Sequence, residues 1–174
     1  MGTKFTYALI LTICGAAFNL LLFFTGFQTE KLAVGQHFQW IGFIVMIVVL
    51  VFGIKAVREE APDKSLSYGK GVGTGVLISL FSGLMSAVYN FIHFKFINTE
   101  FADYQMELVR AKWEQAGMSA AQMEQAEGVA RAMMGPLATS IMTPIMAVLS
   151  GLVISLIASA FLKRAATATP PPVG

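Results

Sequence analysis

Four long apolar stretches without charge constrain this chain more than any other feature. They cover residues 5–27, 38–54, 71–94 and 135–162, and none of them contains an aspartate, glutamate, lysine or arginine. A hydrocarbon core of about 30 Å needs about 20 helical residues, so each stretch reaches or approaches the length of a membrane span. The sequence therefore predicts an all-α integral membrane four-helix bundle, with spans over about 5–27, 38–57, 70–96 and 136–162.

The composition agrees with this interpretation and excludes several classes of protein. Hydrophobic residues make up 56% of the chain and charged residues 13%, whereas soluble domains carry about 25% charged residues. The net charge of +2, without a basic block, does not provide the electrostatic surface that nucleic acid requires. Cys14 has no second cysteine with which to form an intrachain disulfide or a multi-cysteine metal site. We therefore expect no cofactor and no nucleic-acid partner.

Glycine occupies every second position where the third span begins, at Gly69, Gly71, Gly73 and Gly75. A phosphate-binding loop would need a lysine followed by serine or threonine, and no such pair follows these glycines. We therefore expect no nucleotide. Glycines four residues apart lie on one helix face and let another helix approach closely, as Gly71 and Gly75 do in this register. The pattern predicts helix packing.

A second line of small residues runs along the fourth span at a spacing of four residues. It comprises Thr139, Thr143, Ala147, Gly151, Ser155 and Ser159. Such a line permits close contact between helices, so we expect its last four members to pack within the bundle. Pro144 lies inside the same span and removes a backbone donor, which predicts a kink near Ser140 and Ile141. A fixed kink and a moving hinge are both open at this point.

Polar side chains also follow one face of the third span. They recur at spacings of three or four residues, namely Ser79, Ser82, Ser86, Tyr89 and His93, with Asn90 beside them. Residues with this spacing share one side of a helix. We expect this polar stripe, together with Asn19 of the first span, to face the bundle interior or a water-filled cleft. His93 lies close to the outer end of its span, where we favour a hydrogen-bonded structural role over proton transfer.

The connection between the third and fourth spans, residues 99–134, is the only sizeable part outside the apolar stretches. Apolar side chains recur within its charged first half, which predicts a helix over about 99–115. Ser119 and Gln122 form a capping-box pattern that starts a second helix over about 120–134. We expect an extramembrane amphipathic helical hairpin that caps the bundle, and the alternatives are that it lies on the lipid surface or meets a partner. Acidic residues outnumber basic ones here, which disfavours anchoring by anionic lipid.

Basic residues near the span ends indicate the orientation of the chain. One side has Lys4, Lys55, Arg58, Lys70, Lys163 and Arg164, and the other side has Lys31, Lys95 and Arg131. Because cytoplasmic loops carry the excess of lysine and arginine, we expect both termini in the cytoplasm. Residues 1–164 would then form a single membrane domain, followed by a disordered proline-rich tail over 165–174.

The reactive groups that most transporters and enzymes use are scarce in this sequence. No span core contains a charged residue, whereas ion-coupled transporters usually need such groups as carriers. Patterns typical of zinc proteases and serine hydrolases are missing as well. We therefore expect a non-enzymatic assembly or interaction module in a lipid bilayer, acting as a homo-oligomer or with a membrane-protein partner. The alternative is a small oligomeric transporter or channel, with a path lined by the polar stripe of the third span.

Several short segments carry a resemblance to a known family. They are Gly53 to Lys55 with Arg58, Ser67 to Lys70, Ser86 to Asn98, and Pro144 to Arg164. With these features the chain, from about Lys4 to Arg164, resembles the bacterial membrane-protein family catalogued as domain of unknown function 4199. Thr99 stands where members often have proline. The resemblance implies a four-helix protein of the bacterial inner (cytoplasmic) membrane, and it implies no activity and no catalytic residues.

Overall fold

The computed structural model describes residues 2–165, and all the regular secondary structure elements within them are helices. Four helices are long and apolar enough to cross a membrane: α1 (Thr3–Phe24), α3 (Gln39–Glu59) with the turns before it, α4 (Tyr68–Ile92) with the turn after it, and α7 (Pro136–Leu162). Their ends lie within three residues of the four predicted spans, except that the second begins at Leu32 rather than at residue 38. The predicted tail, apart from Ala165, lies outside the described residues.

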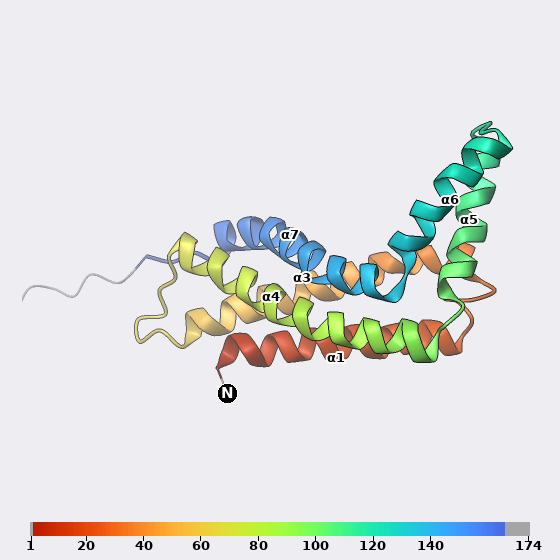
Figure 1. Cartoon of the computed structure of the whole chain (residues 1–174). Coiled ribbons are helices and arrows are strands. Elements are labelled where there is room, and N and C mark those ends of the chain that lie inside the picture. Colours follow the sequence, from red (N-terminus) through yellow and green to blue (C-terminus); the bar gives the residue numbers. More distant parts are fainter. Residues whose placement is uncertain (1, 166–174) are drawn as a thin grey trace, which may run out of the picture.

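The four long helices form one elongated bundle in which α4 has the central position (Figure 1). Helix α4 packs most extensively against α7 and also contacts α1 and α3. Leu50, Ile78 and Ile154 come from three different helices and meet in the buried core. Large apolar side chains point outward on the same helices, for example Phe52, which is 54% exposed, and Leu149, which is 53% exposed. Such an exterior is suited to lipid for two reasons. The outward side chains are apolar, and the helices satisfy their backbone hydrogen bonds internally.

Both described ends of the chain lie at the same end of the bundle (Figure 1). The backbone of Leu66 exchanges two hydrogen bonds with that of Arg164, at 2.9 and 3.0 Å. The hydroxyl of Thr3 donates a hydrogen bond to the carboxylate of Glu60, in the loop between α3 and α4. The basic residues that the sequence assigns to one side therefore gather at this end.

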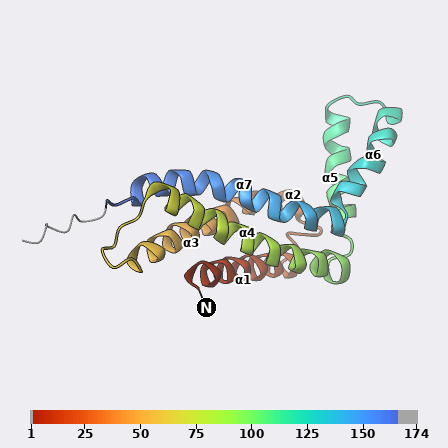
Figure 2. The ribbon, with the colours of Figure 1, turned by 60° about the vertical axis from the view of Figure 1, so that its left-hand side comes forward.

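A helical hairpin of α5 (Phe101–Gln115) and α6 (Ala120–Met134) extends from the opposite end. The predicted capping box is present, because Ser119 accepts a hydrogen bond from the backbone of Gln122 and the Gln122 side chain returns to Ser119. Figures 1 and 2 show the hairpin leaning away from the bundle, whereas we expected it to cap the end. Only the base of the hairpin meets the bundle, where the ring of Phe101 stacks on that of Phe94 with 4.5 Å between the ring centroids.

The direction of the hairpin follows from its two junctions. Asn98 leaves the helical region, with φ of −112° and ψ of 70°, between the end of the third span and α5. Gly135 is extended, with φ of −63° and ψ of 156°, and Pro136 restarts the helix at its first position. These turns lie outside the apolar periodicity, so the pattern of the spans did not predict where the hairpin points.

Two arginines and two acids join the helices of the hairpin. Arg131 donates to Asp103 of α5 at 2.6 Å and to Glu127 at 2.9 Å. Nε of Arg110, in α5, also donates to Oε2 of Glu127 at 3.2 Å. Hydrogen bonds from Arg110 and then from Arg131 hold the pKa of Glu127 at about 2, below its ordinary value of 4.5.

Acid is therefore expected to loosen the hairpin. Because the pKa of Glu127 is lower in the folded chain, its contribution to stability is complete above pH 4.5 and is lost as the pH falls toward 2. The protection factors of the backbone amides in α5 and α6, which correct for the slower intrinsic exchange in acid, should fall over this range, and Glu127→Gln should lower them already at neutral pH. Glu124→Gln, on the same helix, is the control and should leave exchange unchanged. Equal exchange in the two variants would contradict the role assigned to Glu127.

Candidate functional site

A buried polar cluster lies where the third span ends, at the hairpin end of the bundle. After α4 the chain makes one π-helical turn over His93–Ile97, closed by the backbone N–H of Asn98 on the carbonyl of His93 at 2.7 Å. Such turns are rare and often occur at functional sites. The turn places the His93 ring, which is 0% exposed, inside the bundle beside the loop that follows α1.

Both ring nitrogens of His93 have hydrogen-bond partners. Nε2 lies 3.0 Å from Oε1 of Gln28, and Nδ1 lies 3.3 Å from the hydroxyl of Tyr89. Since an amide oxygen only accepts, Nε2 carries the proton, and Nδ1 of a neutral ring accepts from Tyr89. The Tyr89 hydroxyl also donates to the carbonyl of Ala16 at 3.2 Å, so its one proton is shared between these two acceptors. The arrangement favours a structural role for His93, because Nε2 is bound to the loop after α1 and Nδ1 to Tyr89, one turn earlier on α4.

Gln28 connects three segments of the chain through its side chain and backbone. Its amide nitrogen donates to Oδ1 of Asn19 in α1, while its amide oxygen accepts from His93. Asn98 donates to the same oxygen at 3.3 Å and to the Gln28 carbonyl at 3.4 Å. Neither Gln28 nor Asn98 belongs to a pattern from which the sequence predicts a site residue. One signal could have indicated Gln28: Asn19 lies near the end of an apolar stretch, and Gln28 is a polar residue in the loop that follows.

The polar stripe of α4 faces different neighbours rather than one shared opening. Ser82 lies 3.1 Å from the hydroxyl of Thr12 in α1, and Asn90 donates to Thr143 of α7 at 3.0 Å. Tyr89 and His93 belong to the cluster around Gln28, which also includes Asn19. Ser79 is fully buried, and Ser86 is partly buried. A path lined by all of these side chains in one chain therefore has little structural support.

Glycine and serine alternate across the contact between α4 and α7. A Cβ added to Gly75 would lie 2.7 Å from Cβ of Ser155, and one added to Gly71 would lie 3.0 Å from Cβ of Ser159. One turn further, a Cβ on Gly151 would lie 2.5 Å from Cβ of Ser79. The glycine face of one helix thus receives the serine side chains of the other, which permits close backbone approach.

Farther along the same contact, Gly83 of α4 faces α7. A Cβ added to Gly83 would lie 2.8 Å from Cα of Pro144 and 3.0 Å from Cβ of Ala147. Helix α7 continues through Pro144 as one element. Pro144 is therefore a packing residue in this structure, and a hinge at Pro144 would require Gly83 to separate from it.

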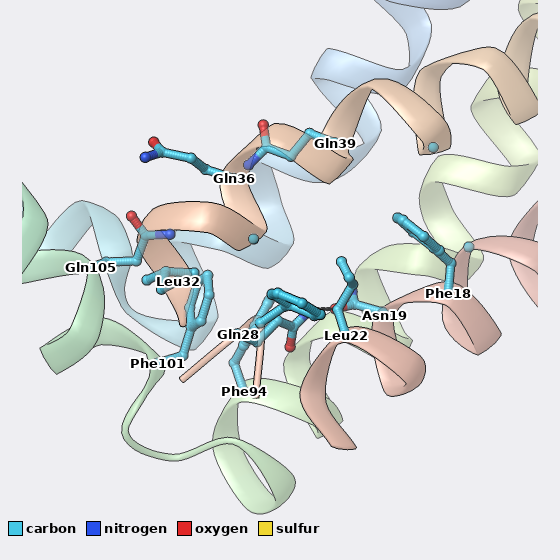
Figure 3. Close-up of a pocket in the computed structure, with 14 residues that line it drawn as sticks. Phe18, Asn19, Leu22, Gln28, Leu32, Gln36, Gln39, Phe94, Phe101 and Gln105 are labelled. Carbon is cyan, nitrogen blue, oxygen red and sulfur yellow. Dashed lines mark hydrogen bonds between the residues drawn. The ribbon is translucent and has the colours of Figure 1, made fainter. Parts of the chain in front are cut away.

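A pocket of about 300 Å³ opens beside the buried cluster, between α1 and the start of α3 (Figure 3). One side comes from α1, with Phe18, Asn19 and Leu22, and the other comes from α2 (Leu32–Gly35) and the residues that follow it. Phe101 and Gln105 of α5 line the end nearest the hairpin. The site contains no charged side chain among its lining residues, but five carboxamides line it: Asn19, Gln28, Gln36, Gln39 and Gln105.

Comparison with known proteins identifies one family. A family model described as "Protein of unknown function (DUF4199)" matches residues 6–164, from within α1 to just beyond α7. No curated protein and no solved structure matches the chain. In residues 2–165, no group of three or more His, Cys, Asp or Glu side chains is placed to hold a metal ion.

Proposed function

The chain belongs to the DUF4199 family, as its resemblance implied, and since that family's description names no function, we propose one from the geometry. The protein is a non-enzymatic membrane module that assembles with a second copy of itself through the outer face of α6. The proposal rests on an exposed, uncharged face in the last two turns of α6. This face is not needed inside the hairpin, because ion pairs already join α6 to α5. The polar side chains inside the bundle support it too, since they bind neighbouring helices.

In the last two turns of α6, beyond Glu124, the outer face consists of small and apolar residues without charge. Gly128 and Ala132 lie four residues apart and are both exposed, and Val129 and Met133 beside them are 64% and 66% exposed. A glycine inside a helix costs about 1 kcal/mol relative to alanine. Nothing lies within 4 Å of a Cβ added to Gly128, so packing within this chain does not require it. Small residues at this spacing let a second helix approach closely.

The charges near this face favour a second copy as the partner. Arg131 is already paired with Asp103 and Glu127, so two facing hairpins would not bring unpaired arginines together. A two-fold symmetric contact uses the same patch on both copies, and such dimers are the commonest closed assemblies. Leu137 and Ile141, exposed at the start of α7, would extend the contact into the bilayer.

Gly128→Leu is expected to abolish assembly without unfolding the chain. The added side chain enters open space in the single chain but blocks close approach of a second α6, while helix propensity improves by up to about 1 kcal/mol. The measurement is the mass of the full chain in nanodiscs, which should correspond to two copies for the original sequence and one for the variant. Ala111→Leu, on the exposed side of α5, should stay dimeric. A single-copy mass for the original sequence would refute self-assembly.

The proposal places the protein in a bacterial inner membrane with both termini in the cytoplasm. Lys4, Lys70 and Lys163 support this orientation, because they lie close to span ends on the side that both termini share. A cysteine at Gln115, in a Cys14→Ala background, should then react with an impermeant thiol reagent added outside the inner membrane. A cysteine at Lys64 should react only after the membrane is opened. The reverse pattern would overturn the orientation.

A further inference from the structure

The pocket between α1 and α3 combines two features that suit one kind of ligand. Its outer part is lined by carboxamides together with apolar side chains such as Leu22 and Leu32, and its inner part is lined by Phe18 with the bare backbone of Gly15 and Gly42. Gly15 lies nine residues before the end of α1, which corresponds to a depth of about 14 Å along the helix. The pocket therefore runs from the hairpin end into the span, polar at its mouth and apolar below.

The polar part can make hydrogen bonds but offers no charge. None of the lining residues is ionisable, so a charged group bound there would lack a counter-ion. Within the described residues the side chains of Gln39 and Gln105 make no hydrogen bond, and Asn19 uses only its amide oxygen, which accepts from Gln28. These groups can donate to hydroxyl or carbonyl oxygens and accept from hydroxyls. Phe94 and Phe101, stacked at 4.5 Å, add a flat apolar wall.

The size of the pocket limits what enters it. A volume of about 300 Å³ is at the lower end of ligand sites, which extend from about 300 to 1,000 Å³. It accepts one small headgroup but not a whole lipid. The two glycines keep the inner part open, because nothing lies within 4 Å of a Cβ added to Gly15 and the nearest atom to one on Gly42 is Phe18 Cδ1 at 4.0 Å. An alkyl chain can continue along this part toward the bilayer centre.

We propose that this pocket binds the headgroup of a lipid that carries hydroxyl and ester oxygens but no charge, with one of its chains along Gly15 and Gly42. The carboxamides recognise the oxygens, and the absence of a lysine or arginine at the site discriminates against phosphate-bearing headgroups. This inference does not depend on self-assembly, since the pocket is formed by one chain.

The test uses the full chain in nanodiscs doped with diacylglycerol, phosphatidylcholine or phosphatidylglycerol of the same acyl composition. Native mass spectrometry counts the lipid that stays bound after the disc is removed. Diacylglycerol should be retained in preference to the two phospholipids. Gly42→Leu, which fills the apolar part, and the double variant Gln39→Leu with Gln105→Leu should each weaken retention by about tenfold, which corresponds to about 1.4 kcal/mol. Gly73→Leu adds the same bulk to an open face of α4 and should retain diacylglycerol normally.

Two outcomes would overturn the proposal. Equal or better retention of either phospholipid would show that the site does not select an uncharged headgroup. Equal retention of diacylglycerol by all the variants would show contact with surrounding lipid only. The thermal midpoint of each variant, measured without added diacylglycerol, shows whether the variant is still folded. Replacing Gln39 and Gln105 should not lower this midpoint, because Gln39 is exposed and Gln105 is only partly buried.

Discussion

One methyl group added at Gly75 is expected to destabilise the bundle by about 1–3 kcal/mol, the usual effect of overpacking a tight core. The new Cβ would lie 2.7 Å from Cβ of Ser155, which is closer than real Cβ atoms approach one another. Neither residue can move away easily, since Gly75 and Ser155 both lie buried in the middle of the contact between α4 and α7. The expected result for Gly75→Ala is a lower midpoint of unfolding in mild detergent, by heat or by added denaturing detergent.

The same helix provides the control. Gly73, two residues earlier, has nothing within 4 Å of an added Cβ, so Gly73→Ala should leave the midpoint unchanged or raise it slightly. Combining Gly75→Ala with Ser155→Gly moves the small residue to the other helix and should recover part of the lost stability. A double-mutant cycle over the two positions measures this coupling. Equal midpoints for Gly75→Ala and Gly73→Ala would mean that the close contact does not hold the bundle together.

Gln28→Leu is expected to lower stability by about 2–4 kcal/mol, because each buried group left unpaired costs about 1–3 kcal/mol. The variant removes the acceptor of His93 Nε2, which is closed to water because His93 is 0% and Gln28 7% exposed, and it removes the donor to Asn19, which borders the pocket. Asn98 would lose its side-chain contact to the same amide as well. Leucine has a similar volume, so the effect reports hydrogen bonding rather than a cavity.

Local exchange separates this effect from a general loss of packing. Amide hydrogen exchange should increase first in the π turn His93–Ile97 and in the loop that contains Gln28, while the α4–α7 contact near Ser155 stays protected. Gln39→Leu is the matched control, because Gln39 is an exposed glutamine at the same end of the bundle. If Gln39→Leu and Gln28→Leu lowered the midpoint equally, the cluster would not be the stabilising element that the structure indicates.

Contacts between neighbouring residues could be predicted from the sequence, whereas contacts between distant segments could not. The capping box at Ser119 and Gln122 could be predicted because both residues lie within one turn, and the backbone groups they satisfy are their own neighbours. The hydrogen bond between Gln28 and His93 joins residues 65 positions apart, and it requires the loop after α1 to fold back over the end of α4. No periodic pattern contains that information, so Gln28 and the pocket beside it were not predicted.

The sequence by itself determined that four helices are long and apolar enough to cross a membrane, because these two properties depend only on consecutive residues and are judged against the thickness of the bilayer. It also determined which helix faces carry small residues, since helical periodicity places them. Only the tertiary structure decided that Ser155 meets Gly75, that Gln28 connects Asn19 to His93, and that the hairpin leaves the bundle at an angle. These features depend on how separate segments meet in space, which the turns at Asn98 and Gly135 and the packing of whole helices control together.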